Sequence, residues 1–377
     1  MLARRLHADE QTISVLSMSV NRLQQLDNKL LEERGGTRAY DYGEGDDDGT
    51  LEQDFETWRD GLWPALVKRF GGKEATRILG EGRGNPLEID ATSSARSLTA
   101  NAHSDIILTE TTGNMYLNNV VSTTGNAVLR AQVAIHSRTE NGAIEQATGL
   151  QDDNSNSDVS ANNITLVADL STIGFSGSDI KVDTKTGTLT VNSAENTHIL
   201  ETSGNLGINT VQTGAEYTAF IASPGSITNG NSTAGISNVL SGKTMLFADD
   251  EIGSEHNPLH TEVGNLEGRS TNGSVWIHNS GHVNVGGVST AASGFSATGD
   301  VNITASSPIT VSEGITVYGD GDLTLNALAD ADLLDDILIQ AGIALSTEHG
   351  DILLNAADNI YIETEARITA GTDDSST

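Results

Sequence analysis

A short phrase returns along most of the chain: a glycine, then Asp or Asn, then two apolar residues separated by one other residue. Each copy predicts a corner followed by a strand, because Gly, Asn and Asp tolerate the positive φ of tight corners and alternation sends every second side chain to one face. The chain is therefore predicted to be a repeat protein. Clear copies begin at Gly113, Gly204, Gly299, Gly321 and Gly350.

The intervals between copies select the kind of repeat. Ser104 and Gly125 lie 21 residues apart, Gly299 and Gly321 lie 22 apart, and some neighbouring copies lie only 8 apart. A coil of a parallel β-solenoid needs roughly 20 residues, whereas propeller blades need roughly 40 and a Trp-Asp signature. The spacing predicts an all-β, right-handed parallel β-helix over residues 91–377, irregular or inserted at about 214–272.

Composition agrees with a narrow core. Aromatic residues make up 4% of the chain and hydrophobic residues 36%, which is lean for a wide globular interior. A solenoid tolerates this, because its interior is a column of Val, Ile, Leu and Ala stacked coil upon coil. The apolar residues recur in register, so the chain is not expected to be disordered.

Residues 1–90 follow a different pattern. Apolar residues recur there at three- and four-residue spacing, which predicts a small α-helical N-terminal segment. The apolar faces of its two helical stretches either pack on each other or cap the first coil of the solenoid. Alternatively, they form a coiled-coil or partner-binding segment. The apolar positions of the two helical stretches are Ile13, Leu16, Val20, Leu23, Leu26 and Leu30, then Phe55, Trp58, Leu62, Trp63, Leu66 and Phe70.

Charge and cysteine content exclude several classes of function. The chain holds 20 Lys and Arg against 52 Asp and Glu, a net charge of -32, which repels nucleic-acid phosphates. It has no cysteine, which excludes disulfides and thiolate zinc sites. No stretch reaches the roughly 20 apolar residues that cross a bilayer. We expect no nucleic-acid partner and no membrane span.

An acidic loop is the candidate metal site. Glu44, Asp46 and Asp48 stand where the first ligands of an EF-hand loop would be, and Glu52 follows. The twelfth position, which needs a bidentate Glu, is Phe55. The loop therefore predicts either a calcium site without its strongest ligand or a solvated acidic linker. No other cofactor is expected.

A second acidic cluster and two histidine pairs are weaker candidates. Paired carboxylates suit acid–base chemistry on a sugar, but Asp322 occupies the corner position of the repeated phrase, so turn chemistry already explains it. The histidines are spaced by four residues without the helix that a zinc-protease pair requires. The residues concerned are Asp320, Asp322, Asp330, Asp332, Asp335 and Asp336, with His256, His260, His278 and His282.

The wording of the repeats, as in residues 187–193 (GTLTVNS) and 321–327 (GDLTLNA), resembles the repeat regions of filamentous-haemagglutinin-like giant bacterial exoproteins. The resemblance implies a secreted parallel β-helix that extends as a shaft and supports attachment. We expect a non-catalytic structural or adhesive segment, extracellular or on the bacterial cell surface, with a host, cell-surface or glycan ligand. The alternatives are a carbohydrate-active β-helix enzyme (a polysaccharide lyase or hydrolase) and a calcium-responsive matrix protein. The oligomeric state stays open.

The acidic loop gives the first prediction. If it binds calcium, adding the ion raises the melting temperature of the full chain, because a ligand that binds only the folded state stabilises it. Replacing Asp46 and Asp48 together by Ala should abolish that rise, whereas Ala at Asp152 and Asp153 should leave it intact. Thermal denaturation followed by circular dichroism measures both, and an unchanged melting temperature of the unmodified chain would discard the site.

Overall fold

The structure, a computed structural model, describes residues 77–78, 87–89, 97–137, 157–231, 233, 235–289, 293–329 and 335–371. The expected N-terminal helices and the acidic loop with Glu44, Asp46, Asp48 and Glu52 lie outside these residues. The second compact unit of the chain, Ile78–Thr377, contains the solenoid.

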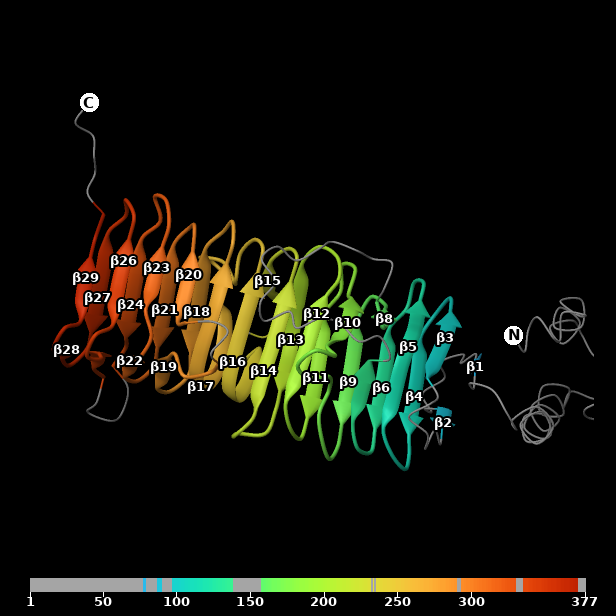
Figure 1. Cartoon of the computed structure of the whole chain (residues 1–377). Coiled ribbons are helices and arrows are strands. Elements are labelled where there is room, and N and C mark those ends of the chain that lie inside the picture. Colours follow the sequence, from blue (N-terminus) through green and yellow to red (C-terminus); the bar gives the residue numbers. More distant parts are fainter. Residues whose placement is uncertain are drawn as a thin grey trace, which may run out of the picture. The chain divides into compact units, whose positions relative to one another are not determined.

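The described residues form a parallel β-solenoid of about 11 turns (Figure 1). All of their regular structure is strand, and they include no helix that is long and apolar enough to cross a membrane. The prediction of an all-β solenoid from the repeated phrase is confirmed.

The strands are short and follow one another at coil spacing. In the first half they are β1 Arg77–Ile78, β2 Leu87–Ile89, β3 Leu98–Ala102, β4 Ile106–Glu110, β5 Met115–Ser122, β6 Ala127–Ala131, β7 Ile135–Ser137, β8 Val159–Ser160, β9 Ile164–Ala168, β10 Ile180–Asp183, β11 Leu189–Ser193, β12 Thr197–Glu201, β13 Leu206–Gln212, β14 Thr218–Ser223 and β15 Ile227–Asn229. In the second half they are β16 Val239–Ala248, β17 Leu259–Ser270, β18 Val275–Asn279, β19 Val283–Val285, β20 Phe295–Ala297, β21 Val301–Ala305, β22 Ile309–Val311, β23 Ile315–Val317, β24 Leu323–Ala327, β25 Ile337–Ile339, β26 Ala344–Thr347, β27 Ile352–Ala356, β28 Ile360–Ile362 and β29 Arg367–Thr369.

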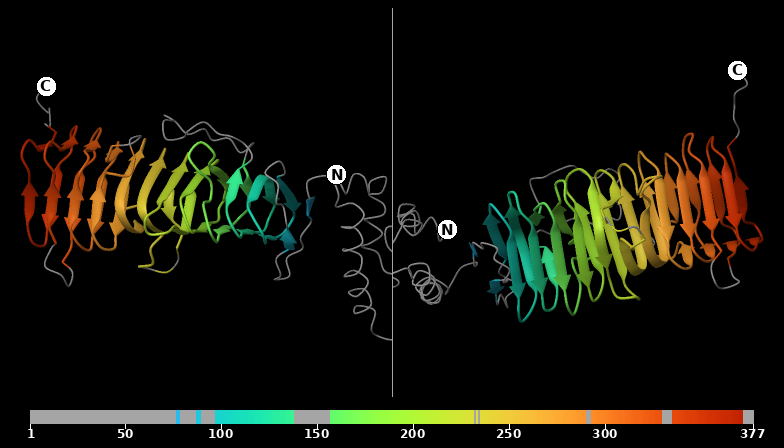
Figure 2. Two further views of the ribbon diagram at one scale, coloured as in Figure 1. Left: turned by 60° about the horizontal axis from the view of Figure 1, so that its bottom comes forward. Right: turned by 180° about the vertical axis from the view of Figure 1, so that it is seen from behind.

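Strands of successive coils lie side by side along the stack (Figure 2), and their pairings define three faces in the last coils. The first face is continuous along the described solenoid: it runs through β2, β4, β6, β9, β11, β13, β16, β17, β18, β21, β24 and β27, all parallel. In the last coils the second face is β19, β22, β25 and β28, and the third is β20, β23, β26 and β29. In the middle coils one long strand spans all three faces: β17 pairs with β18 on the first, β19 on the second and β20 on the third.

Alternation along each strand builds the core. In β24, Leu323 and Leu325 are fully buried while Thr324 between them faces outward. Leu323 stacks on Val301 in the coil before it and on Ile352 in the coil after it, so one aliphatic column continues from coil to coil. Each fully buried aliphatic side chain contributes about 1.5–3 kcal/mol. Removing one therefore destabilises the contacts with both neighbouring coils.

The stretch 214–272 differs from the irregular region expected there. It carries β14 and the two longest strands of the described chain, β16 and β17. The phrase weakens in this stretch because both sides of these strands are buried: Phe220, Met245 and Phe247 face away from the central column and form a second apolar cluster. A strand that is apolar on both sides loses the alternation by which the sequence pattern is recognised.

The corner glycines serve close stacking rather than unusual dihedral angles. Gly299, Gly321 and Gly350 do not have positive φ, in contrast to the phrase glycines Gly204 and Gly281. A Cβ on Gly350 would overlap the carbonyl of Gly321, and one on Gly321 would overlap the main chain of Gly299. The expectation that positive φ selects these glycines is therefore wrong for this column, where each corner presses against the one below.

The glycine column predicts a sharp contrast between two similar substitutions. Gly350→Ala should destabilise the chain by about 1–3 kcal/mol, as overpacking does, because the added methyl group meets the backbone of the coil below. Gly113→Ala is the matched control, since its Cβ would have no atom within 4 Å, and it should change stability by less than about 0.5 kcal/mol. Chemical denaturation compares the two, and equal effects would contradict the stacking argument.

Candidate functional site

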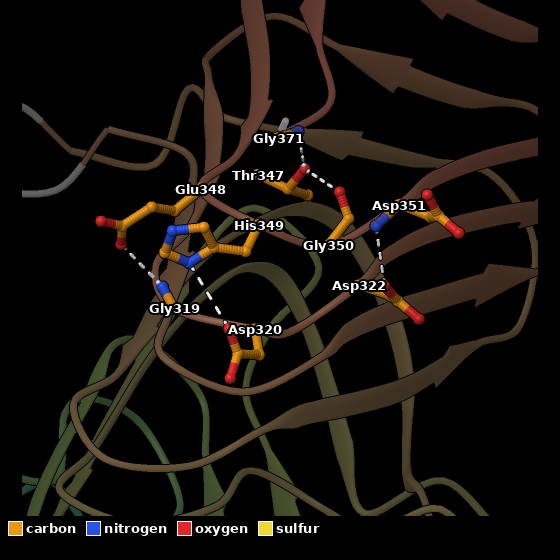
Figure 3. A network of polar contacts seen from close by, with 9 residues as sticks. All are labelled: Gly319, Asp320, Asp322, Thr347, Glu348, His349, Gly350, Asp351 and Gly371. Carbon is orange, nitrogen blue, oxygen red and sulfur yellow. Dashed lines mark hydrogen bonds and ion pairs between the residues drawn. The ribbon is translucent and has the colours of Figure 1, made fainter. Parts of the chain in front are cut away.

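The corner aspartates form a ladder along the stack, and Figure 3 shows its step from Asp351 to Asp322. The main-chain N–H of Asp322 donates to Asp300 Oδ1 at 2.9 Å, and that of Asp351 donates to Asp322 Oδ1 at 2.7 Å. Each carboxylate therefore satisfies the backbone of the next corner. These bonds join corners of neighbouring coils, 22 and 29 residues apart, and do not close a turn within one corner as the sequence predicted; they give Asp322 a structural role.

The other aspartates of the cluster do not converge on one point. The side chain of Asp320 is 99% exposed, with Oδ1 at 3.4 Å from His349 Nδ1. Asp336 Oδ1 accepts from the main-chain and side-chain nitrogens of Asn359, at 2.9 and 3.0 Å. Asp335 is buried, and its main-chain N–H donates to Asp358. Asp330 and Asp332 lie outside the described residues. The described members therefore serve separate corners.

The histidines are paired differently from their spacing in the sequence. His260 and His278 lie opposite each other in β17 and β18, with ring centroids 5.4 Å apart. Burial and the neighbouring His260 lower the pKa of His278. His256 and His282 are exposed. Across the described part of the chain, no three His, Asp or Glu side chains group as metal ligands do.

A pair of neighbouring carboxyl groups, Glu267 and Glu313, lies on the outer side of β17. Glu267 is fully buried and lies against Glu313, which follows β22, and burial together with the charge of Glu313 raises the pKa of Glu267 to about 7. Main-chain N–H groups surround the pair: Val288 donates to Glu267 at 2.5 Å, and Gly287 and Gly294 donate to Glu313 at 3.0 and 2.8 Å.

An aromatic strip runs beside this carboxyl pair. The ring of His198 stacks on Phe220 at 5.3 Å, Phe220 lies 5.6 Å from Phe247, and the guanidinium of Arg269 lies 5.4 Å from the centre of the Phe247 ring. These residues come from β12, β14, β16 and β17, one per coil, and Phe220 and Phe247 belong to the outer apolar cluster. Phe220 is 2% exposed and Phe247 6%. The strip therefore joins successive coils as a second, lateral core.

The geometry of Glu267 and Glu313 favours an anchoring role over acid–base chemistry. Glycosidase carboxyl groups stand about 5–9.5 Å apart so that a sugar, or a sugar and a water, fits between them. Glu267 has no exposed surface, and Glu313 lies near enough to help raise its pKa, so the pair leaves Glu267 no open side for a sugar. With their oxygens engaged by backbone donors, the two side chains tie residues 287–289 and Gly294 to the stack.

Two further buried carboxyl groups, those of Asp158 and Glu201, link successive coils by hydrogen bonds. Asp158 accepts from Ser137 Oγ at 2.9 Å and from the Lys181 main chain at 2.9 Å, so it links the coils on either side of it. Glu201 accepts from Thr184 Oγ1 at 2.9 Å. Both are fully buried, and burial raises the pKa of Asp158 to about 7 and that of Glu201 to about 8.

Sequence reasoning missed these buried acids. Glu201 carried a readable signal, because it occupies an inward position in the alternation of residues 197–201, where an apolar residue is expected. Glu267 carried none, since it lies on the outward side of its strand and is buried by residues from elsewhere in the chain.

Comparison with known proteins gives short matches. A 44-residue stretch is 57% identical to NADPH–cytochrome P450 reductase of Salmo trutta and 52% identical to that of Homo sapiens, and a 51-residue stretch is 43% identical to that of Dictyostelium discoideum. These stretches cover 12–14% of this chain and 6–8% of the reductases. No family model and no solved structure matches the chain. The chain thus spans less than a tenth of the curated relatives it matches.

The buried acids predict an unusual dependence of stability on pH. The folded pKa of Glu201 is about 8 against an ordinary value of 4.5, so the folded chain binds more protons than the unfolded chain between these values. The stabilisation is full below pH 4.5 and is lost as pH rises through about 8, a change on the order of a few kcal/mol. Melting temperatures should therefore fall across this range.

Glu201→Gln separates this effect from the general repulsion of the acidic chain. The variant cannot ionise at that position, so its melting temperature should fall less steeply with pH than that of the unmodified chain. Glu216→Gln, at an exposed position, serves as the control and should leave the slope unchanged. Parallel slopes for all three proteins would contradict the assignment of Glu201 as a buried titrating group.

Proposed function

We propose that the chain is a non-catalytic structural or adhesive β-solenoid segment of a secreted or cell-surface bacterial protein. The observation that carries the proposal is the continuous first face, whose strands repeat in parallel register from β2 to β27. Each coil is held to the next by parallel strand pairing, by the hydrogen bonds of the corner aspartates and by those of the buried acids. Such a stack serves to hold a surface in an extended form.

The outer side of the first face supports an adhesive role. Outward Asn and Thr side chains stand in rows: Asn355 Nδ2 donates to Asn326 Oδ1 at 3.4 Å, and Asn326 Nδ2 donates to Thr304 Oγ1 at 3.3 Å. Asn326 and Asn355 therefore lie in one row across neighbouring coils. Neighbouring coils lie about 4.8 Å apart, so the rows present hydroxyl and amide groups at a regular short interval. A glycan with regularly spaced hydroxyl groups is the ligand we propose for them.

The carbohydrate-active enzyme is the second candidate, and the contact between Glu267 and Glu313 beside the aromatic strip is the observation in its favour. Their close contact and the burial of Glu267 weigh against a sugar between them. The calcium-responsive matrix protein rests on the acidic loop and stays a prediction. The likeness to the reductases covers 12–14% of the chain, so we propose no reductase activity.

The adhesive function predicts binding without turnover. The full chain should adsorb to at least one member of a panel of insoluble polysaccharides, and Thr324→Lys should weaken adsorption by about tenfold, because it places a long cation in the outer row. Thr316→Lys, in the same setting on the third face, is the matched control and should bind normally. Co-sedimentation measures binding, and a reducing-end assay measures cleavage.

Two results would overturn the proposal. Adsorption to no polysaccharide and to no cell surface would remove the adhesive role. Release of sugar that disappears in Glu267→Gln would favour the enzyme instead, provided that the variant keeps the circular dichroism spectrum of the solenoid.

A further inference from the structure

Trp276 lies on the outer side of the first face and is partly exposed there. The alternation of β18 buries Val275 and Ile277 on either side of it, so the indole points away from the core. Its register partners in the three coils that follow, one each from β21, β24 and β27, are Asn302, Thr324 and Leu353. An aromatic ring therefore precedes two hydrogen-bonding side chains in one outer row.

A second outer row of the first face runs beside this one. It begins with His260 and His278, whose ring centroids lie 5.4 Å apart. Burial and the neighbouring His260 lower the pKa of His278, so this imidazole is neutral at neutral pH and offers one donor and one acceptor. The row continues through Thr304, Asn326 and Asn355. Both rows thus change from aromatic rings at β18 to amide and hydroxyl groups at β21 and β24.

The coil before β18 places no side chain beside the indole in its row. Gly253 occupies that position, because Ile252 pairs with the residue before Trp276. A Cβ on Gly253 would overlap the carbonyl oxygen of Trp276. Residues 254–258 then leave the face, since pairing with β18 resumes only at Leu259. The indole therefore has a side-chain neighbour in its row only on the β21 side.

The charges around the two rows favour a neutral ligand. The chain has no Lys or Arg between Arg269 and Arg367, a stretch that contains β18, β21, β24 and β27. The corners before the last three of these strands carry Asp300, Asp322 and Asp351. An anionic polysaccharide would meet like charges at these corners and no lysine or arginine to offset them. A neutral polysaccharide meets neither obstacle.

We propose that Trp276 and His278 form the aromatic end of a binding site for a neutral, β-1,4-linked polysaccharide that lies along the first face. This assignment rests on the proposed adhesive function and names the ligand class. A pyranose ring with equatorial substituents carries C–H groups on its flat faces, and these hydrogens pack on the negative face of an indole. The sugars that follow meet the amide and hydroxyl groups of the two rows. A β-1,4-linked chain is extended, which suits rows that continue without a register shift.

Fluorescence titration of the full chain tests the stacking contact. Replacing Trp58 and Trp63 by Phe leaves Trp276 as the only tryptophan, so its emission reports on this site alone. The probes are short soluble β-1,4-linked oligosaccharides of glucose, xylose and N-acetylglucosamine. At least one of them should change the emission with saturation, whereas an oligogalacturonate should not.

Adsorption to cellulose, xylan and chitin tests the contribution of the ring to binding. Trp276→Ala should weaken adsorption to the matching polysaccharide by about tenfold, because it removes the stacking surface. Trp276→Phe should restore most of the binding. Tyr318→Ala is the matched control, since Tyr318 is an exposed aromatic residue outside the two rows, and it should bind normally. Circular dichroism of each variant shows that the solenoid is retained.

The outcomes separate this site from the adhesive function. Adsorption that Thr324→Lys weakens and Trp276→Ala does not would overturn the aromatic site and leave the adhesive role. An emission of Trp276 that no neutral probe changes, or a preference for the oligogalacturonate, would overturn the site as well. Adsorption of the unmodified chain to no polysaccharide and to no cell surface would remove both proposals.

Discussion

The parallel pairing of each strand with its counterpart one coil away is the interaction on which the rest of the structure depends. It fixes the register, and the register places like residues on like residues: Val301 on Leu323 on Ile352 inside, and Asp300 by Asp322 by Asp351 at the corner. A short phrase can specify a long stack in this way, because every coil is built on the one before it.

The burial of acidic side chains is the second constraint, because these side chains link coils and have raised pKa values. Asp158, Glu201 and Glu267 each bond to groups on another coil or loop while their carboxyl groups are held out of water. The cost of burying a carboxylate is avoided when it is protonated, which is why the pKa of each rises toward neutrality. Three of the chain's acids are thus buried in contacts between coils, with pKa values raised to about 7 or 8.

The central coils and the C-terminal coil differ in where their apolar side chains lie. In β14, β16 and β17 the outer side carries Phe220, Met245 and Phe247, and the stack thickens into a second core. In β28 and β29 the inner side itself is exposed at Ile360, Ile362 and Ile368. On β21, β24 and β27, the outward Thr304, Asn326 and Asn355 form a polar row.

The sequence by itself determined the solenoid, because alternation with glycine and aspartate at the corners is a local pattern that each coil repeats. It also identified Asp322 and its counterparts as corner residues, and the ladder confirmed this. Only the tertiary structure decided which glycines must lack a Cβ, that His260 meets His278, and that Glu267 lies against Glu313. Those contacts join residues 18 to 46 positions apart, and stacking brings them together at distances that no local pattern encodes.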